Sequence, residues 1–274
     1  MSDPLSNSSG APHRVGSDRL FYWALGILSG VYVFLIVAML IADATYTTPG
    51  TLVDSLKSEK IQYAIWLSLI SCTITTILSL WVAVPIGYLM SRVEFRGKAI
   101  VDAILDIPIV LPPLVVGLSL LILFKLQPSA WLREHVVFEI PAVIIAQFMV
   151  ACAFAVRTMR ATFDHISPRR EQVALTLGCT RGQAFFAVVL PEAKRGMVTA
   201  GTLAWARSLG EFGPILVFAG STRLHTEVLP TTVFLELQAG NLHGAIAVSL
   251  IMVFAAVAVL VLARAAGVRN WGIG

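Results

Sequence analysis

The chain has 274 residues, of which 57% are hydrophobic and only 13% are charged, with a formal net charge of +4 at pH 7. Soluble domains carry about 25% charged residues, so this composition, with a mean hydropathy of +0.82, excludes an ordinary water-soluble protein. The three cysteines have neither the spacing of a disulfide framework nor that of a metal site.

Six apolar runs are long enough to cross about 30 Å of hydrocarbon as helices, which takes roughly 20 residues. We therefore expect an all-α, polytopic membrane protein with six transmembrane helices. The polar residues 1–18 are expected to form a disordered cytoplasmic tail, and residues 19–268 to form the transmembrane domain. The runs cover approximately residues 21–42, 63–90, 105–124, 137–157, 197–220 and 242–263.

Most of the 20 Lys and Arg residues fall in segments on the same side of the membrane as the N-terminus. Basic flanking segments tend to stay in the cytoplasm, so this bias predicts that both termini are cytoplasmic. Topology therefore accounts for the pI near 9.1, and the basic excess gives no evidence of a nucleic-acid partner or of an anionic substrate.

The third run contains three prolines near its start, Pro108, Pro112 and Pro113. Each proline removes a backbone donor, so we expect an irregular start to this helix, tolerated only where protein or a cavity satisfies the freed carbonyls. On the predicted topology this is the inner end of the span, where such a start suits a vestibule that faces the cytoplasm. The alternative is an ordinary helix that begins at the membrane surface.

A polar interval between the fourth and fifth runs contains a loop of about residues 164–194, more than a simple connection needs. Ser167 and Pro168 predict the start of a first short helix, with Ser167 as its N-cap. Thr180 starts a second, which continues until Pro191 interrupts it.

The first of these two helices carries an apolar stripe, Val173, Ala174 and Leu177, and Gly178 can end it in a left-handed cap. The sequence thus predicts two short amphipathic helices that meet at a glycine elbow. Such a pair can lie on lipid, pack beneath its own spans or dock onto a soluble partner.

The fifth run places Arg207 and Glu211 four residues apart on one helical face. An unpaired charge at the bilayer centre costs about 2.5–3.5 kcal/mol on insertion scales. One interpretation is an ion pair that satisfies itself, and the other is a pair that faces a water-filled path. Gly210, Gly213 and Pro214 weaken the helix around Glu211, which suits a cavity lining, although small residues also serve close helix packing.

The segment from Thr226 to Gln238 has Pro230 near its start and apolar residues on one face, which predicts a short helix on the outer side. It could be a re-entrant element beside a pore mouth, part of a docking surface, or a plain connection.

Motifs of catalysis are missing from the sequence: it contains no G-x-x-x-x-G-K-[ST], H-E-x-x-H or G-x-S-x-G, and its five histidines are scattered. We therefore expect a chain that is not an enzyme and binds no cofactor. If ATP drives it, another subunit must hydrolyse that ATP.

The polar loop resembles the EAA loop of ABC importer permeases, E-A-A-x3-G-x9-I-x-L-P, because Val173-Ala174 precede Gly178 and Val188-x-Leu190-Pro191 follows after nine residues. The motif's glutamate position holds Gln172 here, with Glu171 one place upstream. In that family the loop forms coupling helices that sit in a cleft of the ATPase subunit. The resemblance implies that coupling involves Glu171, Gln172, Val173, Ala174, Leu177, Gly178 and Arg181.

The string A-R-S-L-G-E-F-G at residues 206–213 resembles molybdate and sulfate permeases in particular, as does the proline-rich start of the third run. This resemblance implies the permease subunit of an ATP-driven importer for a tetrahedral oxyanion. Molybdate is the first candidate, and sulfate or thiosulfate and tungstate are alternatives. It also implies a translocation path or gate formed by Pro112, Pro113, Arg207, Glu211, Phe212 and Pro214.

The implied partners are two copies of an ABC ATPase, which would hold ATP and Mg²⁺, an extracytoplasmic binding protein, the lipid bilayer and a second permease copy. We expect a homodimer of permeases, with a heterodimer as the rival. The implied location is the plasma membrane of a bacterial or archaeal cell. Two other classes remain open: a secondary transporter driven by an ion gradient, with Glu211 as a proton site, and a membrane scaffold without transport.

Overall fold

The computed structural model describes residues 19–47, 49–126 and 130–269, and these residues form helices and no strand. The all-α prediction is confirmed. The chain divides into two units, Met1–Tyr46 and Thr47–Gly274. The expected tail of residues 1–18 lies outside the described residues.

The first unit contains one helix, α1 (Arg19–Tyr46). Its apolar span, Phe21–Tyr46, has a mean hydropathy of 2.6 and is 0% buried. Large side chains such as Trp23 and Leu28 are exposed on it. A helix that is apolar on all sides needs lipid or protein around it. Helix α1 therefore agrees with the first predicted transmembrane span.

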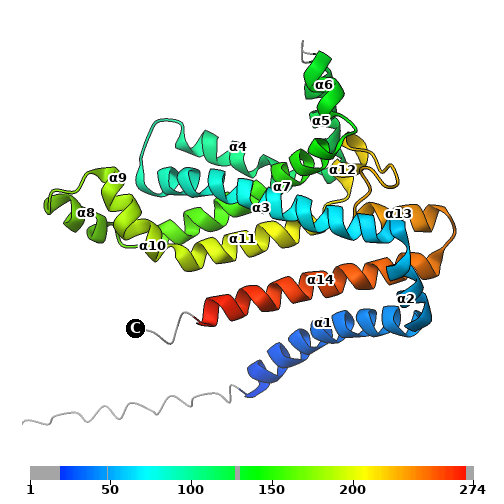
Figure 1. Ribbon diagram of the computed structural model, residues 1–274. Helices are drawn as coiled ribbons and strands as arrows, with labels where there is room; N and C mark the ends of the chain where they lie inside the picture. Colours follow the sequence, from blue (N-terminus) through cyan, green and yellow to red (C-terminus); the bar gives the residue numbers. More distant parts are fainter. Residues whose placement is uncertain (1–18, 48, 127–129, 270–274) are drawn as a thin grey trace, which may run out of the picture. The chain divides into compact units, whose positions relative to one another are not determined.

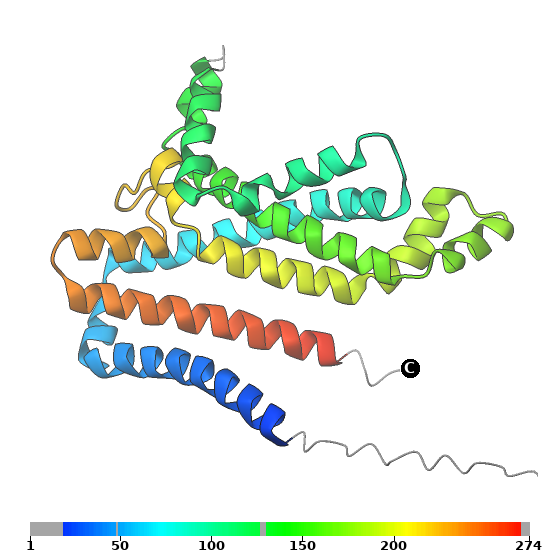
Figure 2. The ribbon, with the colours of Figure 1, turned by 180° about the vertical axis from the view of Figure 1, so that it is seen from behind.

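The core of the second unit is made by three long helices that lie side by side (Figures 1 and 2): α3 (Glu59–Arg92), α7 (Ile140–His165) and α11 (Lys194–Leu209). Fully buried alanines, Ala151 and Ala155 of α7 and Ala200 and Ala204 of α11, line their contact. Small residues let helices approach closely where apolar burial alone drives little association in lipid. A fourth long helix, α14 (Leu242–Arg269), packs against α11 and α13 (Leu229–Gln238).

Two predicted spans are broken. The third run forms α4 (Lys98–Val110) and α5 (Pro113–Lys125), which are bent by 110° where the prolines lie. The fifth run ends as α11 at Leu209 and resumes as α12 (Gly213–Phe218). Among the described residues four helices are long and apolar enough to cross a membrane, or up to five if the bent pair is one span. The predicted number of six is therefore not confirmed.

The connections hold further short helices. The α8–α10 loop contains α8 (Pro168–Thr176), α9 (Arg181–Ala184), the π-helical turn η1 (Phe185–Val189) and α10 (Leu190–Glu192). This loop projects at one end of the second unit, and α12 and α13 lie toward the other end (Figure 1). Helix α13 confirms the short helix expected around Pro230, whereas α2 (Pro49–Lys57) and α6 (Ala130–Val136) were not predicted.

Candidate functional site

The predicted elbow is present between α8 and α9. Gly178 has a φ of +92°, a left-handed conformation that glycine adopts without a side-chain clash. Its N–H donates to Leu175 O at 3.0 Å, and Cys179 N–H donates to Ala174 O at 3.1 Å, which together make a Schellman cap. Thr180 then opens α9 with a capping box to Gln183. Local hydrogen bonds therefore fix the bend.

The two ends of the loop differ from the sequence expectation in detail. Helix α8 does begin at Pro168, but the Ser167 side chain makes no cap hydrogen bond. Pro191 does not end the second helix: the chain widens into η1, in which Leu190 N–H donates to Phe185 O. A proline ring clashes with the carbonyl four residues earlier in an α-helix, and the wider π turn relieves this clash.

The outer face of the elbow carries large apolar side chains without cover. Val173 is 57% exposed and Leu177 is 81% exposed, while Gln172 and Arg181 are exposed beside them. Ala174, expected on the same face, is instead buried inside the loop. Exposed apolar side chains on a projecting loop are typical of a contact with another protein.

Glu171 points away from this exposed face. Its side chain is 13% exposed, and Oε2 lies 3.6 Å from Arg92 Nε of α3. Tyr88 Oη, also on α3, donates to Glu171 Oε1 at 2.5 Å. The motif resemblance placed Glu171 with the coupling residues, but nothing in the sequence pointed to Tyr88 or Arg92 as its neighbours.

The breaks of the third and fifth runs pack against each other, although about 100 residues separate them in the sequence. A Cβ on Gly213 would lie 2.9 Å from Pro113 Cβ, and one on Gly117 would lie 2.8 Å from Pro214 Cα. Real Cβ atoms do not approach so closely, so this contact of α5 with α12 requires glycine on both sides. Pro113 and Pro214, both predicted for the path, are thus neighbours. Pro112 is exposed beside them.

A buried glutamine stabilises the break between α11 and α12. Gln147 of α7 is 1% exposed, and its Nε2 donates to Ser208 O at 3.3 Å. Thr75 Oγ1 donates to Gln147 Oε1 at 3.2 Å. Glu211 N–H also donates to Ser208 O at 3.2 Å, so Gln147 adds a second donor to the backbone at the break, where irregular backbone within a membrane protein needs protein partners. The sequence analysis missed Gln147, because a single amide in an apolar run does not reveal its partner.

The Arg207–Glu211 ion pair is formed at this break. The Glu211 side chain is 1% exposed, whereas that of Arg207 is 32% exposed. The Arg207 guanidinium also lies 5.8 Å from the centre of the Phe154 ring. Phe212, half-buried, places its ring 5.3 Å from that of Phe234. A buried carboxylate with an arginine as its charge partner is costly to separate from it.

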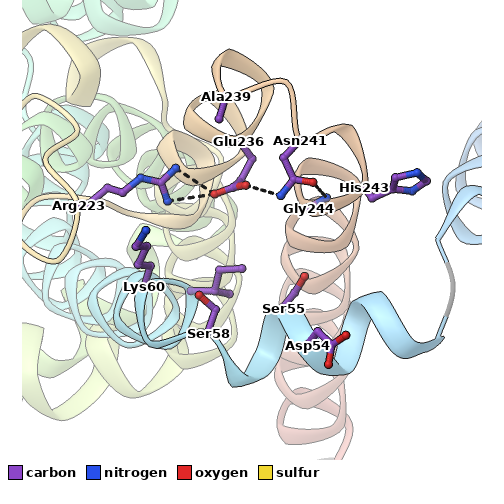
Figure 3. A pocket seen from close by; sticks show the side chains of 11 residues that line it. Asp54, Ser55, Ser58, Lys60, Arg223, Glu236, Ala239, Asn241, His243 and Gly244 are labelled. Carbon is purple, nitrogen blue, oxygen red and sulfur yellow. Dashed lines mark hydrogen bonds and ion pairs between the residues drawn. The ribbon is translucent and has the colours of Figure 1, made fainter.

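A second polar cluster lies around the end of α13 and the start of α14, at a pocket of about 510 Å³ (Figure 3). Arg223 donates to Glu236 Oε1 through both terminal nitrogens at 3.0 Å. Asn241 Nδ2 donates to Glu236 Oε2 at 2.7 Å, and its Oδ1 accepts from Gly244 N–H. Lys60 and Asp54 also line this pocket, so its two cations and two carboxylates balance rather than attract an anion.

Glu227 is linked to this cluster through Arg223: its side chain is 0% exposed, and Oε1 lies 3.8 Å from Arg223 Nη1. Burial raises the pKa of the Glu227 carboxyl, and hydrogen bonding and the charge of Arg223 oppose the rise. Within the described part of the chain, no group of three or more His, Cys, Asp or Glu residues could hold a metal ion.

The family model for the binding-protein-dependent transport system inner membrane component matches residues 83–268, which include the elbow and both breaks. The chain belongs to this family. A probable molybdenum ABC transporter permease protein of Haloferax volcanii is 31% identical over 90% of this chain and 89% of its own length. The sulfate transport system permease protein CysT of Escherichia coli is 31% identical over 70% of this chain and 72% of its own length.

A solved structure of a bacterial alginate ABC transporter, in complex with an alginate-bound periplasmic protein, contains a chain of the same fold. The TM-score is 0.73 at 18% identity, with 94% of this chain and 96% of that chain covered. The relatives are permease subunits, which are non-enzymatic transport components, as predicted. As a member of the binding-protein-dependent inner membrane family with several apolar helices, the chain is a multi-pass membrane protein.

Proposed function

We propose that the chain is the permease subunit of an ATP-driven importer, that the α8–α10 loop docks onto the ATPase, and that the cargo is a tetrahedral oxyanion, molybdate first. The observation that carries the proposal is the rigid, glycine-capped elbow with Val173 and Leu177 uncovered on its outer face. The chain has no phosphate-binding loop of its own, so the energy of ATP has to enter through such a contact.

The orientation and the assembly belong to the same proposal. Both termini and the elbow face the cytoplasm, where two ATPase copies hold ATP and Mg²⁺. ATP binding brings the ATPases together, the elbows follow, and the cavity turns outward to accept the anion from a binding protein. Hydrolysis resets it. One chain encloses only half of such a path, so a second copy, in a homodimer, supplies the other half.

We propose that the translocation path runs past the two breaks that pack against each other, the one between α4 and α5 and the one between α11 and α12. The candidate residues lie at the breaks or in the helical turns beside them, where neither run continues as a straight helix: Pro112, Pro113, Arg207, Glu211, Phe212 and Pro214. Charged residues of membrane helices commonly mark ion pathways, and Arg207 is the one cation of this set. Its partial exposure leaves it accessible to a passing anion, while the ion pair to Glu211 limits how tightly that anion is held.

The test is the ATPase contact. Purified ATPase is added to liposomes that contain the wild-type chain, Leu177→Asp or Gly178→Arg, and ATPase binding and ATP-dependent anion uptake are measured. Both variants should lose binding and uptake, because a charge or a bulky side chain occupies the docking face. Leu224→Asp, the same substitution on an exposed leucine outside the α8–α10 loop, should bind the ATPase normally. Uptake that proceeds without any ATPase would instead support a gradient-driven transporter.

The identity of the anion needs a separate measurement. Competition of unlabelled molybdate, tungstate, sulfate and thiosulfate against labelled molybdate, with the cognate binding protein present, ranks the candidates. We expect molybdate to compete best. Wild-type uptake in cells that lack the chain would contradict the proposal and favour a scaffold without transport.

A further inference from the structure

We infer that Tyr88, Arg92 and Glu171 form a pin that transmits movement of the coupling helix α8 to the membrane helix α3. This inference rests on the proposed docking of the ATPase. It assigns Glu171 a positioning role inside the permease, although its place beside the motif's glutamate position suggests a contact with the ATPase. The residues of the pin come from two segments about 80 residues apart in the sequence, so no local pattern announces it.

The geometry of the pin is specific. Tyr88 Oη donates to Glu171 Oε1 at 2.5 Å, and Arg92 Nε lies 3.6 Å from Glu171 Oε2. Arg92 Nη2 donates in addition to Ile166 O at 2.7 Å, at the point where the chain leaves α7 for the loop. The Arg92 and Glu171 side chains are only 12% and 13% exposed. A charge-assisted contact with so little water around it is stronger than an exposed ion pair.

The Tyr88 ring is held on both sides. Its centre lies 5.7 Å from the ring of Phe163 in α7 and 4.7 Å from the ring of Phe185 in η1, both at edge-to-face angles. One position earlier, a Cβ on Gly87 would lie 2.9 Å from Met159 Cβ, so α3 and α7 touch there through backbone. Tyr88 therefore sits on a rigid part of α3, and its hydroxyl has a fixed direction toward α8.

The pin matters because α8 is otherwise attached mainly to its own loop. The elements it contacts most are α9 and η1. An open pocket of about 560 Å³ lies between α8 and the end of α3, and the three residues of the pin line it together with Leu89, Gln172 and Phe185 among others. Apolar packing across that space is incomplete, so a push on the exposed face of α8 reaches α3 through the Glu171 carboxylate.

The experiment compares ATP use with anion import in reconstituted complexes of wild-type chain, ATPase and binding protein. Tyr88→Phe keeps the ring packing and removes only the hydroxyl, and Glu171→Gln removes the charge that Arg92 pairs with. Each variant should still bind the ATPase, because Val173 and Leu177 are unchanged. Each should hydrolyse at least about tenfold more ATP per imported anion than wild type, the lower end of the scale of a lost charge-assisted hydrogen bond.

Two controls separate a pin from general loosening. Glu94→Gln breaks an exposed ion pair with Lys98 close to the pin and should leave the ratio of ATP to anion unchanged. The double variant Tyr88→Phe, Glu171→Gln should be no worse than the more affected single variant, because both changes remove one connection. Thermal midpoints of all variants should lie close together.

The outcomes distinguish this inference from the proposed function. If wild-type chain binds no ATPase, the proposed function fails and the ratio has no meaning. If wild-type import is coupled to ATP and both single variants keep the wild-type ratio, the pin is wrong while the function stands. If the variants lose ATPase binding itself, Glu171 is a docking residue, which also overturns the inference.

Discussion

The elbow and the paired breaks are both irregular interruptions of helical structure, but they are held in opposite ways. The elbow is stabilised within a dozen residues, by a Schellman cap at Gly178 and a capping box at Thr180. The breaks are stabilised across the chain, by Gln147 on the Ser208 carbonyl and by glycines that admit Pro113 and Pro214. A segment that must present a face to another protein carries its own scaffold, whereas a segment within a bundle takes its shape from its neighbours.

This contrast predicts that the largest loss of stability from a single substitution occurs at the breaks, in the variant Arg207→Gln. Removing the arginine leaves the buried Glu211 carboxylate without its charge partner. We expect the free energy of unfolding to fall by about 3 kcal/mol, near the lower end for a buried pair because Arg207 is 32% exposed. Chemical denaturation in detergent measures this loss.

The double variant Arg207→Met, Glu211→Leu then tests whether Arg207 and Glu211 form only a structural ion pair or also act in the translocation path. Replacing both charges by apolar side chains should restore most of the stability. Under the proposed path role, uptake should stay low. Full recovery of both stability and uptake would show that the pair is only structural.

The second prediction concerns the close contact of α5 and α12. Gly117→Ala places a methyl carbon only 2.8 Å from Pro214 Cα, so the helices must move apart. We expect a loss of roughly 2 kcal/mol and a marked fall in uptake. Gly50→Ala is the matched control, because nothing lies within 4 Å of its added Cβ. Equal thermal midpoints for the two variants would contradict the packing.

The third prediction is that Gln147→Leu destabilises by about 1.5 kcal/mol, because the Ser208 carbonyl and the Thr75 hydroxyl lose a buried partner. Gln147→Glu should recover little, since a carboxylate cannot donate to a carbonyl. A thermal midpoint of Gln147→Leu equal to that of wild type would mean that the Glu211 N–H, which donates to Ser208 O at 3.2 Å, satisfies this carbonyl without Gln147.

The fourth and smallest effect belongs to the elbow. Gly178→Ala should cost about 1 kcal/mol, because a φ of +92° is unfavourable for an L side chain. Gly182→Ala, four residues later, has open space around its added Cβ and an ordinary φ, and should cost nothing. The measurement is protease resistance of the loop, since a locally stabilised segment can loosen while the bundle stays folded.

The same contrast explains how much the sequence could predict. Runs of apolar residues predict helices, and the sequence predicts the elbow from Gly178, Thr180 and Pro168, because these signals act within one or two helical turns. The breaks were only partly predictable: prolines and glycines marked them, but a continuous apolar run concealed that the fifth predicted span stops at Leu209. Gln147, Tyr88 and Arg92 could not be assigned, since each acts on a partner far away in the sequence.

The π-helical turn η1 fits one more residue into a turn than an α-helix does. In an α-helix each residue adds about 100° of rotation, whereas the wider turn of η1 takes up its extra residue with little change in the direction of the flanking chain. Deleting a single residue between Phe185 and Val189 should therefore leave Val173 and Leu177 pointing almost as before. The deletion instead places the Pro191 ring against the carbonyl four residues earlier, so its cost should fall on the helix at Pro191 and not on the orientation of the elbow.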